Sequence, residues 1–150
     1  MVEVPGDFMT RLKGSCYCGN IVVDVQLSKP AHEYSPRACD CGFCTKHGAA
    51  YVSDSEGSLS FRVKEMKALG RFRQSRDGQA EFLHCTHCGV LVGVVFQEGE
   101  TLFGAFNSSA VDGNIQFAQK VVVSPRLLSA ADKAARWKEV WFKNVTLAPL

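Results

Sequence analysis

The sequence predicts a single, mainly β domain that spans 1–150 and carries one short helix near its C-terminus. Two observations lead to this fold class: apolar and polar residues alternate along several short segments, and turn sequences containing glycine separate those segments. The 150 residues are 46% hydrophobic and 21% charged, which is enough apolar material for one buried core. Segments joined by short turns form hairpins, so we expect a largely antiparallel sheet.

Seven segments are expected to form strands. In the first, 21–27, four apolar residues alternate with a face that carries Asp24 and Gln26. The others are 59–63, 69–74, 80–84, 90–96, 101–106 and 120–123. The Asp77-Gly78 dipeptide predicts a hairpin turn at 76–79. The almost wholly apolar segment 90–96 is expected to be a central strand that is buried on both faces.

One helix is expected at about 129–142, where several alanines with Trp137 and Trp141 form an irregular apolar stripe. Ser129 is its predicted N-cap, with Asp132 as the acidic partner three residues later. We expect this helix to pack against the sheet and to bury its tryptophans. The alternative is a helix that docks a partner or a second copy of the chain.

Composition also limits localisation and partners. No apolar run is long enough to span a membrane, and the first seven residues lack the basic-then-apolar order of a secretory signal. We therefore expect a cytoplasmic protein, in which clustered cysteines bind metal rather than form disulfides. The formal net charge is +2, and two zinc ions with seven thiolates would bring it to about −1, so neither nucleic acid nor a membrane is an expected partner.

All seven cysteines fall into three clusters. These are Cys16-x-Cys18, Cys39-x-Cys41-x-x-Cys44 and Cys85-x-x-Cys88. Glycine follows Cys18, Cys41 and Cys88 directly, and we expect each of these glycines to take a positive φ that turns backbone amides toward a thiolate.

Ligand counting predicts two zinc ions per chain. Two separate two-cysteine turns supply a closed tetrahedral site most simply, so Cys16, Cys18, Cys85 and Cys88 are expected to hold a structural ion. The cluster of Cys39, Cys41 and Cys44 would hold a second ion whose fourth position stays open, as in catalytic zinc sites. Other arrangements stay open: His47 could close the second site, and His84 or His87 could also ligate. An iron–sulfur cluster is disfavoured, because isolated ions suit cysteine turns that long strands separate.

A three-thiolate site favours one kind of chemistry. Three thiolates leave Zn²⁺ with a formal charge of −1, which makes it a weaker activator of water than a three-histidine site. Such an ion suits the capture of an exogenous thiol as a fourth thiolate. The sequence contains neither a serine–histidine–acid signature nor a phosphate-binding loop.

Three motifs, in order, resemble the glutathione-dependent formaldehyde-activating enzyme and centromere protein V family. They are Gly14-Ser-Cys-Tyr-Cys-Gly19, Cys39-Asp-Cys-Gly-Phe-Cys-Thr-Lys-His-Gly48 and Phe82-Leu-His-Cys-Thr-His-Cys-Gly89. The resemblance covers roughly 12–95, so the segment from Asn107 onward lies outside it. It implies a tent-like β fold with the same division into a structural and a catalytic zinc site. It also implies formation of S-hydroxymethylglutathione from glutathione and formaldehyde.

The sequence therefore predicts a zinc-dependent carbon–sulfur lyase or synthase that acts on a small thiol adduct, with glutathione as a candidate thiol. His47 and Tyr51, which follow the second cluster, are candidates for moving a proton or orienting the adduct. The alternative is a non-catalytic zinc module that binds a protein or chromatin partner. A homodimer is compatible with either function.

Overall fold

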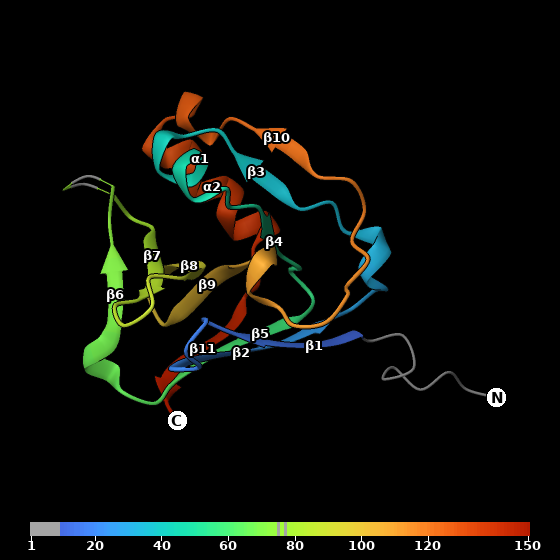
Figure 1. The fold of residues 1–150 in the computed structure, drawn as a ribbon. Coiled ribbons are helices and arrows are strands. Elements are labelled where there is room, and N and C mark those ends of the chain that lie inside the picture. The colour runs from blue at the N-terminus through green and yellow to red at the C-terminus, as the bar shows by residue number, and fades with distance from the viewer. Residues whose placement is uncertain (1–9, 75, 77) are drawn as a thin grey trace.

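Two β-sheets dominate the computed structural model, which describes residues 10–74, 76 and 78–150 (Figure 1). The smaller sheet contains, in spatial order, β1 (Thr10–Ser15), β2 (Ile21–Leu27), β5 (Ser58–Val63) and β11 (Asn144–Pro149). The larger sheet contains β10 (Val121–Val123), β3 (Arg37–Cys39), β4 (Tyr51–Val52), β9 (Thr101–Asn107), β8 (Leu91–Glu98), β7 (Glu81–Cys85) and β6 (Leu69–Phe72). The predicted mainly β fold class is therefore confirmed.

Most neighbouring strands are antiparallel, as predicted, but two pairs are parallel. β10 pairs in parallel with β3, and β11 pairs in parallel with β5. Four strands were not predicted from the sequence: β1, β3, β4 and β11. The predicted 76–79 turn includes Asp77, which lies outside the described residues.

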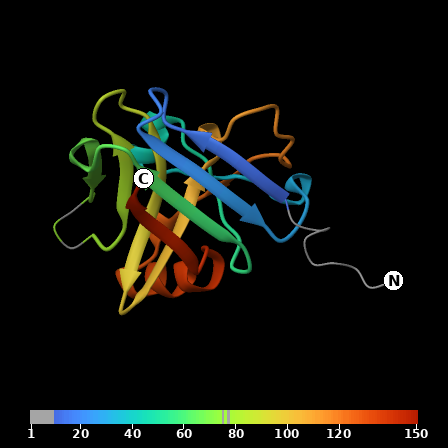
Figure 2. The same cartoon turned by 90° about the horizontal axis from the view of Figure 1, so that it is seen from below.

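The main hydrophobic core lies between the two sheets. Figure 2 shows the smaller sheet in front of β8 and β9, whose strands run at an angle to it. Phe61 of β5 is fully buried and contributes to this core. A Cβ atom at Gly93 of β8 would come within 2.6 Å of both the Phe61 ring and the Ala105 carbonyl oxygen, so a side chain there would push the sheets apart. β8 is buried on both faces from Leu91 to Phe96, which confirms the predicted central strand.

Two α-helices lie at the same end of the larger sheet (Figure 1). α2 (Ala130–Val140) corresponds to the predicted helix, and its Ser129 side chain accepts a hydrogen bond from the Asp132 N–H as an N-cap. α2 is followed by Trp141, which is buried, and it carries Trp137, which is half-buried. The shorter helix α1 (Gly42–His47) was not predicted, because six residues are too few to show a helical period.

Single 3-10 turns connect several elements: η2 (Ala31–Glu33), η3 (Met66–Ala68), η4 (Ser108–Ala110) and η5 (Pro125–Leu127). Within the described residues, no helix has the length and apolar character that crossing a membrane requires.

Candidate metal centres

The first cysteine group joins the two sheets. Cys16 and Cys18 lie in the turn between β1 and β2 of the smaller sheet, whereas Cys85 ends β7 and Cys88 lies in the turn before β8 of the larger sheet. The four sulfur atoms lie within 4.8 Å of one another and could hold a metal ion. We call these four residues the four-cysteine centre.

Sulfur spacing at this centre fits a tetrahedral zinc ion. The Cys16 and Cys18 sulfurs are 3.8 Å apart, and those of Cys18 and Cys85 are 3.6 Å apart. Four sulfurs at about 2.3 Å from a zinc ion would be separated by about 3.8 Å. Disulfide sulfurs would lie about 2.0 Å apart, so these cysteines are not bonded to one another.

The two turns of the four-cysteine centre have the same backbone form. Gly19 has a φ of 85° and Gly89 a φ of 83°, as the sequence predicts. The Ile21 N–H donates to the Cys16 sulfur over 3.3 Å, so the turn places an amide against a thiolate. The prediction was wrong for Gly42, which takes no positive φ, because it begins α1 instead of closing a turn.

The second group, Cys39, Cys41 and Cys44, comes from one short segment. Cys39 ends β3, Cys41 is the N-cap of α1, and Cys44 lies inside that helix. The Cys44 N–H donates to the Cys41 sulfur over 3.4 Å. All three sulfurs lie within 4.8 Å of one another and could hold a second metal ion. We call this group the three-cysteine centre.

Two other polar side chains contact the three-cysteine centre. The Tyr51 hydroxyl lies 3.4 Å from the Cys44 sulfur, and the Gln74 amide nitrogen donates to the Cys41 sulfur over 3.3 Å. Burial raises the pKa of Tyr51, and the charge of Cys44 raises it further. The phenol is therefore protonated at neutral pH and can donate a hydrogen bond.

At each centre one cysteine has a lowered pKa and another has a raised pKa. A hydrogen bond from Cys44 lowers the pKa of Cys39 to about 6, and the same contact together with burial raises the pKa of Cys44. Burial raises the pKa of Cys85 to about 12. Burial also opposes ionisation of Cys88, but backbone N–H groups of Cys18 and Val90 lower the pKa of Cys88 to about 6. Closely packed sulfurs with such acidic members suit a divalent cation, which stabilises every thiolate at once.

The histidines lie apart from both groups of sulfurs. Within the described residues, no histidine joins either cysteine group within 4.8 Å. His47 is exposed at the end of α1 and packs against the Phe43 ring, with centroids 4.6 Å apart. The His84 ring packs over Gly70, and His87 lies 3.5 Å from the Glu65 carboxylate.

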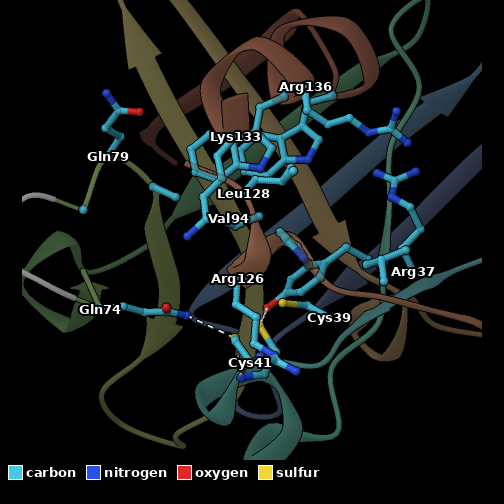
Figure 3. Close-up of a pocket in the computed structure, with 18 of the residues that line it drawn as sticks. Arg37, Cys39, Cys41, Gln74, Gln79, Val94, Arg126, Leu128, Lys133 and Arg136 are labelled. Atoms are coloured by element: carbon cyan, nitrogen blue, oxygen red, sulfur yellow. Dashed lines mark hydrogen bonds between the residues drawn. The ribbon is translucent and has the colours of Figure 1, made fainter. Parts of the chain in front are cut away.

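The three-cysteine centre opens onto a cavity of about 460 Å³ between the larger sheet and α2 (Figure 3). Its apolar wall includes Phe82, Val94, Trp137, Val140 and Trp141. The Trp137 and Trp141 rings stack with centroids 4.9 Å apart. Tyr51 lines the same cavity, whereas His47 does not. The structure therefore brings one of the two predicted catalytic candidates to the cavity.

Basic side chains also line this cavity, and sequence analysis missed them. They are Arg37 of β3, Arg126 of η5, and Lys133 and Arg136 of α2. Burial lowers the pKa of Arg37, and the nearby charge of Arg136 lowers it further. Positions 130, 133, 136, 137 and 140 of α2 all reach the cavity, and this helical spacing is the signal that could have identified them.

Comparisons with known proteins support the fold and leave the family open. No family model matches the sequence, and no curated protein matches it. A crystal structure of a Rhodobacter sphaeroides protein, solved as a structural-genomics target, is similar with a TM-score of 0.50 and 21% identity. The match covers 68% of this chain and 89% of that one. At this identity, the likeness supports the fold alone.

Proposed function

We propose that this protein is a zinc-dependent carbon–sulfur lyase or synthase that acts on a small thiol adduct, of the S-(hydroxymethyl)glutathione synthase type. One observation carries the proposal: three cysteines converge on the wall of a cavity that is large enough for a small molecule. Among the described residues, no fourth Cys, His, Asp or Glu joins them within 4.8 Å. Three protein ligands and an accessible fourth position are typical of catalytic zinc.

Cys39, Cys41 and Cys44 would hold the zinc ion, which would supply a Lewis-acid position that keeps a substrate thiol deprotonated at neutral pH. The chain contributes the rest of the site. The aromatic wall of Trp137, Trp141 and Phe82 limits the access of water to the adduct. In the synthetic direction a carbon–sulfur bond forms to the carbonyl carbon as the carbon–oxygen π bond breaks. The carbonyl oxygen then gains a proton, and the proton that the thiol releases on binding balances the reaction.

Tyr51 is assigned the role of proton donor. Its hydroxyl lines the cavity beside Cys44, and its raised pKa keeps it protonated, so it can donate a hydrogen bond to an oxygen that gains charge. His47 does not line the cavity, so the proposal gives it no part in this step.

Titration of the zinc-loaded protein with glutathione tests the proposal. Calorimetry should show one thiol bound per chain with release of a proton, and added formaldehyde should give the S-hydroxymethyl adduct. Cys41→Ser is a suitable inactive control, because serine keeps the N-cap of α1 while removing one thiolate. Absence of thiol binding at millimolar concentration would contradict the proposal.

The second candidate is a zinc module that binds a protein partner. It is supported by an exposed apolar strip along β10 and η5, in which Val122 is 75% and Leu127 72% exposed. β10 is also an edge strand, and such edges can pair with another chain. A protein that binds no thiol but retains two zinc ions would favour this candidate.

A further inference from the structure

Besides the three cysteines, the charged side chains that line the cavity are all basic. Arg37, Arg126, Lys133 and Arg136 line it, and no aspartate or glutamate does so among the described residues. Arg126 is neutralised, because its Nε lies 3.1 Å from the Asp40 carboxylate. The other three basic residues form no ion pair within the part of the chain that the structure describes. Apart from the thiolates of the three-cysteine centre, the cavity lining among the described residues therefore offers these three cations no negative side chain.

Two of these charges face each other. Arg37 extends from β3 and Arg136 from α2, and Figure 3 shows their guanidinium groups pointing toward one another. Arg37 donates a hydrogen bond to the neutral Ser53 hydroxyl over 2.6 Å, which fixes its direction without neutralising it. Arg37 is half-buried and Arg136 is exposed, and two like charges that face each other repel unless an anion binds between them. Guanidinium groups match the planar geometry of a carboxylate.

One face of α2 carries two of these basic residues. Lys133, Arg136 and Trp137 lie on one face of α2, so the helix presents cations and an aromatic ring to the same cavity. The next residue, Lys138, does not line the cavity and instead pairs with Glu98 over 3.1 Å. Lys138 therefore has an acidic partner on the protein, whereas Arg136, two residues earlier, faces the cavity without one.

We propose that Arg37, Lys133 and Arg136 form a subsite for a carboxylate, and that the thiol which binds at the three-cysteine centre carries that carboxylate. The second half of this inference rests on the proposed function, whereas the anion subsite does not. A ligand that joins a thiol to a carboxylate would contact both the cysteines and the basic residues. Neutral thiols would bind at the cysteines alone.

A matched pair of small thiols tests this inference. Calorimetry on the zinc-loaded chain would compare 3-mercaptopropionate, which has a carboxylate, with 2-mercaptoethanol, which is neutral and of similar size. We expect the carboxylate to bind about tenfold more tightly or better, because a charge-assisted pair contributes at least that factor. Arg136→Gln should remove this advantage and leave the affinity for 2-mercaptoethanol unchanged. Arg136 is exposed and glutamine is a good helix former, so the variant should fold.

Lys138→Gln is the matched control, because it removes one positive charge from the same helix outside the cavity. It should leave both affinities unchanged. Equal binding of the two thiols by the unmodified protein would overturn the inference. The inference would also be overturned if Arg136→Gln weakened the binding of both thiols equally. That result would mean that this arginine balances the thiolates of the metal centre.

A third ligand tests the carboxylate subsite even if the proposed function is wrong and no thiol binds at the metal centre. 3-(Methylthio)propionate keeps the carboxylate but has no free thiol. If no thiol binds at the metal, this thioether should still shift the Trp137 indole N–H signal in NMR titrations, and Arg136→Gln should abolish the shift. Absence of any shift would overturn the subsite.

Discussion

The two cysteine centres have similar ligands but very different surroundings. The four-cysteine centre takes its sulfurs from turns in both sheets, and Cys18 and Cys85, whose sulfurs are 3.6 Å apart, lie 67 positions apart in the sequence. The three-cysteine centre takes all its sulfurs from one six-residue segment and faces a cavity. A metal that closes a long loop restricts the unfolded chain far more than one bound within a short segment. From this difference we propose that the first centre stabilises the fold and that the second binds ligand.

Removal of one ligand from each centre should separate these roles most strongly. Cys85 and Cys39 both end strands, so Cys85→Ser and Cys39→Ser form a matched pair. Cys85→Ser should lower the free energy of unfolding by about 4 kcal/mol or more, because structural zinc contributes on the order of 10 kcal/mol in small domains. Cys39→Ser should cost less than about 2 kcal/mol, since its zinc closes only a short segment.

Zinc content and denaturant unfolding would measure both effects. Each variant should lose one zinc per chain, and only Cys39→Ser should remain well folded while losing thiol binding. A larger loss of stability in Cys39→Ser than in Cys85→Ser would reverse the assignment of the two centres.

Removal of the Tyr51 hydroxyl at the three-cysteine centre should slow adduct formation, whereas removal of a tyrosine hydroxyl at the four-cysteine centre should not. Tyr51→Phe keeps the ring but removes the group that lies 3.4 Å from the Cys44 sulfur. We expect the rate of adduct formation to fall about 100-fold, as for loss of a positioned proton donor, with zinc content unchanged. Tyr17, between Cys16 and Cys18, is 90% exposed, so Tyr17→Phe is the control beside the other centre and should leave the rate unchanged. An unaltered rate in Tyr51→Phe would remove this residue from the mechanism.

A smaller effect on stability is expected from hydrogen bonds to Asp54, which link the two sheets without a metal ion. The Asp54 carboxylate, which follows β4, accepts hydrogen bonds from the Ser28 N–H after β2 over 2.7 Å and from the Tyr34 hydroxyl over 2.6 Å. Burial and the hydrogen bond to Asp54 raise the pKa of Tyr34 to about 12. The unfolded value is about 10, so this contribution to stability is complete below pH 10 and is lost as the pH rises toward 12.

The free energy of unfolding of the unmodified protein should therefore fall relative to Tyr34→Phe between about pH 10 and pH 12. We expect about 1 kcal/mol, because solvent screens the partly exposed ring. Other groups that titrate in this window are present in both proteins, so their contributions cancel in the comparison. If the stability curves of the two proteins ran parallel through this window, the pKa of Tyr34 would not be raised on folding, which would contradict this prediction.

Periodic and chemically distinctive features could be predicted from the sequence. Alternation predicted β2 and β5, the apolar run predicted β8, and an N-cap serine with an apolar stripe predicted α2. The grouping of the cysteines followed from ligand counting, since two turns of two and one cluster of three allow few tetrahedral combinations.

β1 was missed although it pairs with the next strand, β2, whereas the other missed strands leave little local signal. β3 and β4 have only three and two residues, too few to show an alternating pattern. β11 pairs in parallel with β5, which lies far from it in the sequence. The cavity cations were missed for the same reason. Arg37 and Arg136 are far apart in the sequence, and a charged residue on a helix is usually a solvated one.

The central claim is that the three-cysteine centre has a free ligand position and the four-cysteine centre does not. X-ray absorption at the zinc edge tests it most directly, because it counts sulfur neighbours. Seven protein sulfurs shared by two ions give a mean of 3.5 per zinc, and saturation with glutathione should raise this mean to about 4. An unchanged sulfur count at saturating thiol would contradict the claim.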